Sequence, residues 1–587
     1  MSDWTSRPTV RGTFGVVSTT HWLASQSAMA VLEDGGNAFD AAVAAGFVLQ
    51  VVQPHLNGPA GEVPIILAPV GGAVRVLCGQ GPAPQGATIE HYRSLGLDLV
   101  PGTGPLAAAV PGSFDAWLTL LRDHGTKPLA EVLTYAIGYA ESGHPVSPLL
   151  AATVARMREQ FETEWTTSAE VYLPAPETGT LFRNPALART WRTLLRACAG
   201  GTREAEIEAA RRIWREGFIG EAVADFAAKP AMDTSGRRHA STLVGDDLVR
   251  YAASYEEPAG HDWRGWTVYK PGAWSQGPVF LQQLALLSDE FGYDDPEYVH
   301  ILVEGTKLAM ADREAWYGDA APVPLDDLLS GGYNAGRRAM IDARASHELR
   351  PGTPGGRIPL LPGLPVAQGE APAASIRPPG TGEPTVRADG VTRGDTCHLD
   401  VADRWGNLVS ATPSGGWLQS SPAIPGLGFP LGTRLQMAWL EPDLPNSLTP
   451  GRRPRTTLSP SIAARDGVPV LAFGTPGGDQ QDQWSLHFFL AVALGGLDLQ
   501  AAIDAPNWHT ASFPGSFHPR TMSPGSLTVE SRLGDRAITA LRERGHLVTV
   551  DEPWSQGRLC AVARDPHTGV LSAAADSRGV QGYAVGR

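Results

Sequence analysis

The stretch DTCHLDVADRWGNLVSAT, residues 395–412, decides how this chain can be interpreted. Two runs of apolar and β-branched residues flank the turn-forming sequence RWGN, and this pattern predicts a β-hairpin. Thr396 stands at the head of the first predicted strand. A threonine in that position is usually only the start of a strand, so its meaning depends on the residues that come before it.

The preceding segment, at about residues 348–394, is rich in proline and glycine and has few apolar residues at regular spacing. Such a segment buries too little surface to offset the entropy that is lost when a chain becomes ordered. The composition is consistent with an interdomain linker. It is equally consistent with a flexible tail that ends beside a processing site, and the segment itself does not distinguish the two.

The sequence Gly394-Asp395-Thr396 has the arrangement that a processing site requires. A threonine hydroxyl needs a neighbouring base to act as a nucleophile, and an N-terminal threonine has one in its own α-amine, whose unperturbed pKa is about 8. Cleavage between Asp395 and Thr396 would uncover this amine. Cys397 is a rival nucleophile, one position further along the chain.

Upstream of this point, the first third of the chain has the pattern of helices. LASQSAMAVLEDGG ends in two glycines, and AFDAAVAAGFVLQVV is apolar on nearly every face. Further helical patterns cover residues 113–122, 128–141, 149–161, 204–228 and 298–316. Downstream, VPVLAFGT and a C-terminal hairpin predict strands. Helices followed by strands indicate an α+β architecture in which helices cover a central sheet.

The composition argues against several classes of protein. A formal net charge of −14 and a pI of about 5.5 are unlike those of a nucleic-acid-binding domain. The four cysteines lie far apart, so we expect neither a disulfide framework nor a structural metal site. GxSxG, Walker A and HExxH motifs are absent. The N-terminus lacks the apolar run of a signal peptide and the apolar windows are too short to span a bilayer, so we expect a cytoplasmic enzyme.

Several segments, taken in order, resemble the gamma-glutamyltransferase family and its acylase and amidase relatives. These proteins are N-terminal-nucleophile hydrolases. The matching segments are GVVSTTHWLASQSAMAVLEDGGNAFDAAVAAGFVLQVVQPH (15–55), AAAVPGSFDAW (107–117), DTCHLDVADRWGNLVSAT (395–412), PNSLTPGRRPRTTLSPSI (445–462), FGTPGGDQQDQW (473–484) and ADSRGVQGYAVG (575–586).

The resemblance implies a four-layer αββα sandwich, built jointly by two pieces of one precursor. The large subunit would comprise residues 1–395, with its flexible tail at about 348–394, and the small subunit would comprise residues 396–587. The family needs no metal and no organic cofactor, and its substrate is a small molecule with an amide bond. Two processed units could associate as a dimer.

The resemblance also implies which residues carry out catalysis. Thr396 matches the nucleophile, and cleavage falls between Asp395 and Thr396. Ser414 matches the hydroxyl residue that orients the amine of the nucleophile. Gly477 and Gly478 match the pair whose backbone N–H groups form the oxyanion hole, although two adjacent glycines taken alone indicate only a tight turn.

Further positions match the substrate-binding part of the family pattern. Thr412 matches a threonine that lines the site, and Thr456 and Thr457 match paired hydroxyl residues that hold the carboxylate of the substrate. Without the resemblance, these two threonines would be interpreted as part of a surface strand. Gln436 lies beside the expected acyl-binding positions.

The chain departs from a typical gamma-glutamyltransferase at the positions that grip an amino-acid head group. The segment CGQGPAP (78–84) has no arginine, Gly416 replaces an asparagine, and Ala438 and Trp439 replace an acidic pair. A glutamyl group would lose its charge partners, at a cost of several kcal/mol on the order expected for unpaired buried groups. Arg434 or Arg455 could hold a simple carboxylate instead, although an arginine in such a loop is often solvated.

We therefore predict an amidohydrolase of the branch that resembles oxamate amidohydrolase and related acylases. It would cleave a small carboxylate-bearing amide, and oxamate is the most specific substrate that we predict. A glutathione hydrolase and gamma-glutamyltransferase with a rearranged pocket is the second hypothesis, and an acylase of cephalosporin side chains is close to the first. A catalytically inactive relative that serves as a binding or scaffold protein is the alternative from another class.

Overall fold

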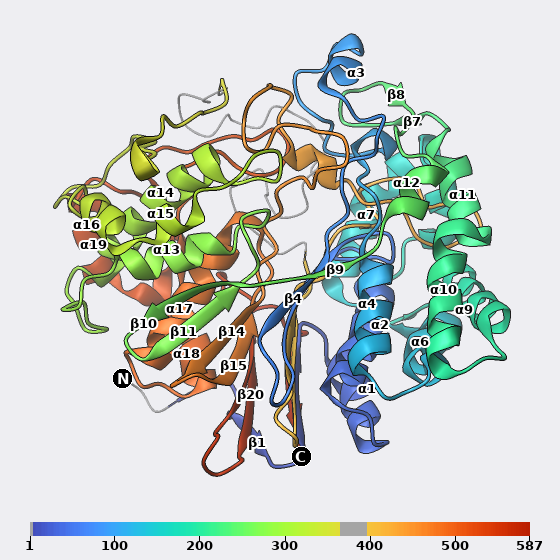
Figure 1. Ribbon diagram of the computed structural model, residues 1–587, viewed down its shortest axis with the longest axis horizontal. Coiled ribbons are helices and arrows are strands. Elements are labelled where there is room, and N and C mark those ends of the chain that lie inside the picture. The colour runs from blue at the N-terminus through green and yellow to red at the C-terminus, as the bar shows by residue number, and fades with distance from the viewer. Residues whose placement is uncertain (1–3, 364–395) are drawn as a thin grey trace.

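The computed structural model describes residues 4–363 and 396–587. Two seven-stranded sheets lie face to face at the centre, and helices cover the outer face of each sheet (Figure 1). The predicted four-layer αββα sandwich is therefore confirmed. Asp395 and residues 364–394 of the predicted tail lie outside the described residues.

Within each large sheet, every pair of neighbouring strands is antiparallel. The first sheet has the spatial order β1 (Val10–Gly12), β20 (Leu571–Ala575), β19 (Cys560–Arg564), β15 (Val468–Gly474), β14 (Ser461–Arg465), β11 (Trp266–Lys270) and β10 (Ala259–Trp263). The second sheet has the spatial order β21 (Tyr583–Gly586), β2 (Gly15–Thr19), β12 (Leu399–Asp403), β13 (Leu408–Ala411), β3 (Val63–Ala68), β4 (Arg75–Gly79) and β9 (Ser254–Glu256).

Segments on either side of residue 396 are interleaved in both sheets. In the second sheet, β12 pairs with β2 on one side and with β13 on the other, and β13 in turn pairs with β3. In the first sheet, β14 pairs with β11. Neither segment completes a sheet alone, so both are needed to form the layers that position the site.

The helices fall into two layers and several peripheral groups. On the side of the second sheet, α1, α2 and α4 contact its strands directly and the other helices pack around these three. This group comprises α1 (Trp22–Glu33), α2 (Ala38–Val52), α4 (Ser113–His124), α5 (Leu129–Val132), α6 (Thr134–Ser142), α9 (Pro185–Cys198), α10 (Arg203–Glu216), α11 (Phe218–Ala227) and α12 (Gly245–Arg250). On the side of the first sheet, α13, α17 and α18 contact its strands directly. This group comprises α13 (Pro278–Leu286), α14 (Tyr298–Trp316), α17 (Gln481–Ala493), α18 (Leu499–Asp504) and α19 (Asp535–Glu543), which share one apolar core.

Shorter elements lie outside the four layers. The remaining helices are α3 (Ile89–Ser94), α7 (Pro148–Thr163), α8 (Thr166–Tyr172), α15 (Leu325–Leu329) and α16 (Gly331–Arg338). The remaining strands are β5 (His144–Pro145), β6 (Leu181–Phe182), β7 (Ala231–Met232), β8 (Arg238–His239), β16 (Trp508–His509), β17 (Ser526–Glu530) and β18 (Leu547–Asp551).

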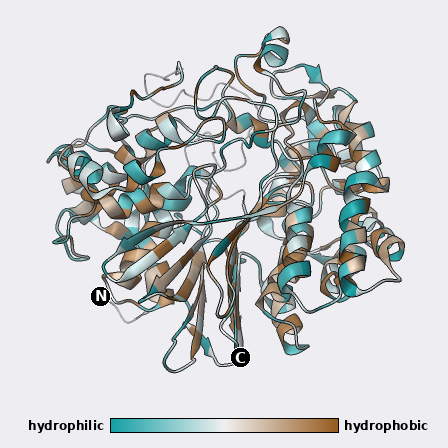
Figure 2. Cartoon of the chain, viewed as in Figure 1, coloured by the Kyte–Doolittle hydropathy of each residue, from teal (hydrophilic) through white to brown (hydrophobic). Residues whose placement is uncertain are grey.

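Apolar side chains form a separate core between each pair of layers, as Figure 2 illustrates by the brown colour along the central strands. The core between the two sheets includes Val16, Ile66, Ala402, Ala472 and Val562. Small and branched side chains suit this space because two sheets pack about 10 Å apart.

Helix α2 is buried on every face, as its sequence predicts, because it lies between the second sheet and several other helices. Its start is fixed by a capping box, in which Asn37 accepts hydrogen bonds from the first turn and Asp40 accepts one from the Asn37 backbone.

The prediction that the first third is helical is wrong at several strands, of which β2, β3 and β4 are the longest. Every residue of β2 and β3 is buried, so their sequences lack the alternation that marks a half-exposed strand. The predicted helix at 204–228 is divided at Gly217 into α10 and α11. The helices expected near 113–122, 149–161 and 298–316, the hairpin of β12 and β13, and β15 are confirmed.

The first part of the predicted flexible tail packs against α14. Trp316 donates from Nε1 to the Gly352 carbonyl at 3.1 Å, and the Gly352 N–H donates to Asp312 at 2.6 Å. Pro354 is buried in a short 3₁₀ helix, η2 (Pro354–Gly356). These buried contacts extend beyond position 348, where a flexible tail was expected to begin.

None of the helices in residues 4–363 and 396–587 is both long and apolar enough to cross a membrane.

Candidate active site

Thr396 lies just before β12, a central strand of the second sheet, and is held there by an antiparallel bridge to Ser414. Its hydroxyl Oγ1 lies 3.2 Å from Ser414 Oγ, within hydrogen-bond distance, and both side chains are 1% exposed. Ser414 also forms a bridge with Glu62, so two segments meet at this serine. The structure thus brings together the predicted nucleophile and its predicted hydroxyl partner.

A buried ion pair between Glu62 and Arg434 stands behind Ser414. Arg434 Nε donates to Glu62 Oε1 at 2.6 Å, and Arg434 Nη2 donates to Ser414 Oγ at 3.1 Å. A guanidinium group can only donate, so the serine oxygen accepts this bond and the serine proton can be directed to Thr396. Burial raises the pKa of Glu62, and the charge of Arg434 opposes that rise.

Aromatic and sulfur-containing side chains enclose the Arg434 guanidinium. Its central carbon lies 5.5 Å from the ring centre of Trp417 and 5.7 Å from that of Phe517, and Nη1 is 3.3 Å from Met437 Sδ. These neighbours exclude water, so a charge held here acts strongly on the atoms beside it. Arg434 is therefore a fixed positive charge one residue away from Thr396, in contrast to the solvated arginine that its loop sequence allows.

A histidine network that the sequence analysis did not identify lies between the two sheets, next to Thr396. His398 Nδ1 is 2.9 Å from Thr412 Oγ1, and His398 Nε2 is 3.1 Å from both carboxylate oxygens of Asp400. Burial raises the pKa of Asp400, and His398 opposes the rise. The available signal was strand alternation, because residues 396, 398 and 400 share one face. Thr412 contacts this histidine.

Cys397 lies on the opposite face of the same strand, in the core formed with α2. Its Sγ is 3.1 Å from both Gln53 Oε1 and Asn57 Nδ2, and it is completely buried. The rival nucleophile therefore points away from the face that carries Thr396 and His398.

The glycine pair forms a turn between β15 and α17. Gly477 has φ +131° and Gly478 has φ +55°, both in the region that favours glycine. A Cβ on Gly477 would lie 2.3 Å from Trp484, and one on Gly478 would lie 3.1 Å from Phe517. The turn leads into the N-terminus of α17, where backbone N–H groups and the helix dipole favour negative charge. The oxyanion role stays a prediction.

Strand β15 directs this turn toward the nucleophile. Gly474, its last residue, packs so closely on His398 that a Cβ there would lie 2.3 Å from the imidazole. His398 is two residues from Thr396 on the same strand face. The chain that continues from Gly474 therefore leaves the first sheet beside the start of β12.

The two predicted carboxylate-binding threonines are buried, and Thr456 forms a parallel bridge with Ser275. The Thr456 N–H donates to the Trp274 carbonyl at 3.0 Å, and Thr456 Oγ1 accepts from the Leu458 N–H at 3.3 Å. Thr457 Oγ1 is buried and has no hydrogen-bond partner within the described residues. A buried hydroxyl normally has a partner, so this one suits a bound ligand or water.

The other predicted substrate contacts are engaged within the protein. Arg455 Nη2 pairs with Glu314 at 2.7 Å. Gln436 donates from Nε2 to the Gly102 carbonyl at 3.1 Å and accepts from the His518 N–H at 3.2 Å. Substrate binding by Arg455 and Gln436 stays a prediction, and it would require each side chain to exchange or share these partners.

A cavity of about 10 Å³ adjoins Thr396 and is also lined by Gln53, Arg558 and Asp576. This volume accommodates about one water molecule. Burial raises the pKa of Asp576 to about 6, and Arg578 opposes the rise. The cavity gives the nucleophile a small neighbouring space that both polar and apolar residues line.

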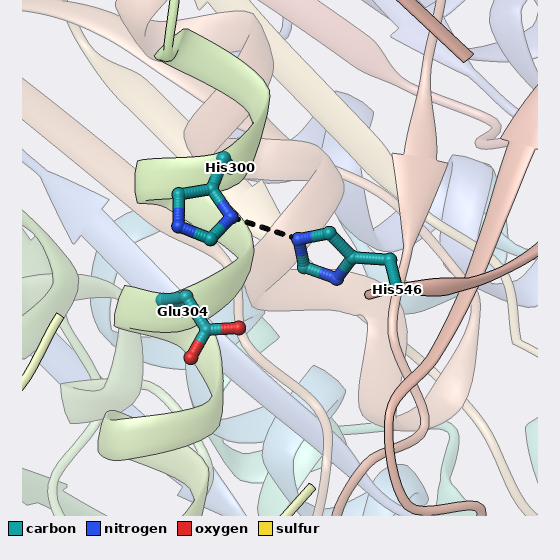
Figure 3. Close-up of side chains that lie close together, drawn as sticks. All are labelled: His300, Glu304 and His546. Carbon is teal, nitrogen blue, oxygen red and sulfur yellow. Dashed lines mark hydrogen bonds between the residues drawn. The ribbon is translucent and has the colours of Figure 1, made fainter. Parts of the chain in front are cut away.

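Among the described residues, His300, Glu304 and His546 are the side chains close enough together to form a metal-binding group (Figure 3). His300 Nε2 is 2.7 Å from the Asp342 carbonyl and so carries a proton, which leaves Nδ1 to accept from His546 Nε2 at 2.9 Å. Glu304 is paired with Lys307 at 2.6 Å. This group is a hydrogen-bonded contact in which an ammonium already neutralises the carboxylate, and we assign no metal to it.

The His300–His546 contact predicts a dependence of stability on pH. Burial lowers the pKa of His546 to about 3, and the charge of Lys307 acts in the same direction. His546 therefore stays neutral in the folded protein while the unfolded chain takes up a proton below pH 6.5. Stability should fall as pH decreases from 6.5 toward 3, by up to about 1.4 kcal/mol per pH unit for each such proton.

Replacing His546 with glutamine should lower the number of protons that the chain takes up on unfolding by about one, so stability should depend less steeply on pH. The measurement is the urea concentration at half-unfolding between pH 8 and pH 5, compared with the exposed control His567→Gln. An unchanged pH slope in His546→Gln would contradict the assignment, whatever the change in stability at pH 8.

The fold and the site together define a class of protein. A helix-covered pair of sheets, with a threonine at the head of a central strand and a hydroxyl partner against its Oγ1, is the architecture of an N-terminal-nucleophile hydrolase. Comparison with known proteins identifies the family within this class. The model of the gamma-glutamyltranspeptidase family matches residues 24–586, and the chain belongs to this family.

Individual relatives support the same assignment. An oxamate amidohydrolase proenzyme from Klebsiella pneumoniae subsp. pneumoniae is 30% identical over 588 residues, which cover 96% of this chain and 97% of that protein. A solved structure named LmbA2991HD is 68% identical, with a TM-score of 0.95 over 100% of both chains. A cephalosporin acylase from Bacillus halodurans is 26% identical, with a TM-score of 0.81 over 100% of this chain and 98% of that one. The chain is accordingly an amidohydrolase of the N-terminal-nucleophile type.

Proposed function

We propose that the protein hydrolyses an amide of a small carboxylate-bearing substrate through an acyl-enzyme on Thr396. The observation that carries the proposal is the chain of contacts from Glu62 through Arg434 and Ser414 to Thr396 Oγ1. These four residues are buried, and their contacts hold the Thr396 hydroxyl at the start of a strand. Those are the requirements for a positioned nucleophile.

The first step in this proposal is self-cleavage. Thr396 Oγ attacks the carbonyl carbon of Asp395, the peptide C–N bond breaks, and the acyl group of Asp395 moves onto the threonine oxygen as an ester. One water then hydrolyses the ester, which yields a carboxylate on Asp395 and the free α-amine of Thr396. The products are a large subunit of residues 1–395 and a small subunit of residues 396–587.

The mature enzyme would repeat this chemistry on the substrate. The α-amine of Thr396 takes the hydroxyl proton as Oγ attacks the amide carbonyl, and the N–H groups of Gly477 and Gly478 stabilise the oxyanion. The proton passes to the departing amine as the C–N bond breaks. A second water, or an acceptor amine, then releases the acyl group and restores the threonine.

The acyl-binding positions favour a group without an α-amine. Trp439 is buried and donates from Nε1 to Glu314 at 2.8 Å, so an indole fills a position where the family pattern has an acid. A Cβ on Gly416, which has φ +65°, would lie 3.1 Å from Gly61 N, so this turn leaves little room for an asparagine. Thr457, whose hydroxyl has no partner within the described residues, remains to receive a carboxylate or carbonyl oxygen, whereas Arg434 already pairs with Glu62. The named activity of the oxamate amidohydrolase relative agrees with this choice.

A substrate panel tests the proposal. We expect kcat/KM for oxamate or a glutaryl anilide to exceed that for γ-glutamyl anilide by about 100-fold or more, because the ammonium group would be buried without a partner. Faster turnover of γ-glutamyl anilide would favour the glutathione hydrolase hypothesis. An uncleaved chain that hydrolyses none of the three would indicate an inactive binding relative. A cytoplasmic location and a dimer of processed units stay predictions from the sequence.

A further inference from the structure

A buried cluster of five charged residues lies beside the glycine turn, and we refer to it as the arginine cluster. Its members are Arg313, Glu314, Arg455, Asp479 and Arg520. Three guanidinium groups face two carboxylates, so the cluster has one positive charge in excess. Glu314, Arg313 and Arg455 are at most 3% exposed. A buried excess charge is costly unless something compensates it.

The ion pairs show which arginine carries the excess. Arg455 pairs with Glu314 at 2.7 Å, and Arg313 pairs closely with Asp479 and lies 3.4 Å from Glu314. No ion pair to Arg520 is found among the described residues. Arg434 does not carry an excess charge either, because it is paired with Glu62. Arg520 is thus the cationic member of the cluster without a carboxylate.

The hydrogen bonds of Arg520 are also incomplete. Nη2 donates to the Gln436 carbonyl at 2.9 Å, while Nε and Nη1 are buried and have no partner within the described part of the chain. The guanidinium stacks on Trp439, 3.8 Å from the ring centre. A guanidinium group has five N–H donors arranged to match a planar anion. The side chain is 2% exposed, so bulk water does not satisfy these donors.

The position of Arg520 connects it to the glycine turn. The Arg520 N–H donates to the Phe517 carbonyl at 2.7 Å, so the two residues close one tight turn. Phe517 packs against Gly478, where a Cβ would be 3.1 Å from its ring. Ser516, at the start of this loop, donates from Oγ and from its N–H to Asp479 at 2.6 and 2.9 Å. The loop that carries Arg520 is therefore tied to the proposed oxyanion hole.

A second connection leads to the nucleophile through the 3₁₀ helix η3 (Arg434–Met437). Arg520 binds the carbonyl of Gln436 in this helix, and Arg434, at its start, donates to Ser414. Ser414 contacts Thr396. Helix η3 therefore contacts both Arg520 and Ser414, and Ser414 is the residue that contacts the hydroxyl of Thr396.

We propose that Arg520 receives the carboxylate of the substrate acyl group, through Nε and Nη1, which have no hydrogen-bond partner within residues 4–363 and 396–587. The inference rests on the proposed function and names the group that selects its substrate. It assigns this role to a residue in the small subunit loop at 513–520, distinct from Arg434, which orients Ser414, and from Arg455, which neutralises Glu314. The class of substrate is an amide whose acyl part ends in a carboxylate.

The electrostatic environment supports this assignment. Burial lowers the pKa of Arg520 to about 9, and Arg455 and Arg313 act in the same direction against Glu314 and Asp479. A bound carboxylate would supply the missing negative charge and accept from an edge of the guanidinium.

The test measures binding and turnover separately in the wild-type enzyme. Oxalate, succinate and glutarate are titrated into the protein by calorimetry, with the neutral compound glutaramide as a comparison. The same titrations are made with Arg520→Met and with Arg532→Met, a matched control whose guanidinium stacks on Trp554 and pairs with Glu530 at 3.1 Å. Turnover is measured with a glutaryl anilide and with its carboxamide counterpart.

We expect at least one dicarboxylate to bind the wild type, with an affinity reduced about 10-fold to 100-fold in Arg520→Met and unchanged in Arg532→Met. Arg520→Met should lower kcat/KM for the glutaryl anilide by a similar factor and that for the carboxamide by less than about 3-fold. Arg520→Lys keeps the charge and should recover part of the affinity. It replaces Arg520→Met if that variant does not fold, and its affinity should then be lower than that of the wild type.

Equal dicarboxylate affinity in the wild type and the Arg520 variants would overturn the inference, as would a wild type that binds none of the three. An equal loss on the charged and neutral substrates would also overturn it, because a purely structural role gives that result. If dicarboxylates bind in an Arg520-dependent manner while no amide is hydrolysed, the proposed function fails and the carboxylate site stands.

Discussion

Thr396→Ala is expected to remain a single polypeptide and to lose amide hydrolysis by a factor of about 10⁴ or more. The substitution removes the oxygen that attacks Asp395 and the oxygen that later attacks the substrate, so one change abolishes both reactions. Thr396 is 1% exposed, and Cys397 is fully buried on the other face of the strand, so Cys397 cannot take its place. Gel electrophoresis and a single-turnover assay measure the two effects.

Thr396→Ser is the matched control for this prediction. Serine keeps the hydroxyl and, after cleavage, the α-amine, and it loses only a methyl group. We expect Thr396→Ser to divide into two fragments and to retain measurable turnover. Full turnover by Thr396→Ala, or a normally cleaved Thr396→Ala chain, would exclude Thr396 as the nucleophile.

Gly477→Ala is expected to lower kcat by about 10²-fold to 10³-fold, the size of effect seen when one oxyanion-hole donor is lost. The new Cβ would lie 2.3 Å from Trp484, and a φ of +131° is unfavourable for alanine, so the turn must shift. A shift of the turn moves the N–H groups of Gly477 and Gly478 away from the developing oxyanion. The measurement is kcat for the best substrate of the panel, together with the extent of cleavage.

Gly467→Ala is the matched control for the glycine turn. Gly467 has φ +79°, and a Cβ there meets nothing within 4 Å, so this variant carries a similar backbone strain away from the site. We expect Gly467→Ala to keep the wild-type kcat. A Gly477→Ala enzyme with wild-type kcat would mean that this turn does not hold the oxyanion.

The sequence predicts the elements whose signals are local. Helix α2 has a continuous apolar pattern of helical length and a capping box, and the β12–β13 hairpin has two short apolar strands around a turn. Strands β2 and β3 were predicted incorrectly because both faces are buried, which removes the alternation. Short apolar runs of this kind do not distinguish a buried strand from a buried helix.

The candidate site likewise contains some residues that the sequence predicts and others that it does not. The positions of Thr396, Ser414 and the glycine pair follow from motifs that are each continuous in the sequence. The ion pair of Glu62 with Arg434 joins residues 372 positions apart, and neither has a local pattern that names the other. Arg520 is available to a ligand because its Nε and Nη1 have no partner among the described residues, and only the packed structure reveals this.

The central claim is that the working nucleophile is the N-terminal threonine of a cleaved chain, and mass spectrometry of the active wild-type protein with a slow substrate tests it most directly. We predict two fragments, of which the smaller begins Thr-Cys-His-Leu-Asp and gains the mass of the acyl group on Thr396 during turnover. An active, unbroken polypeptide of 587 residues, or an acyl group carried by any other residue, would contradict this account.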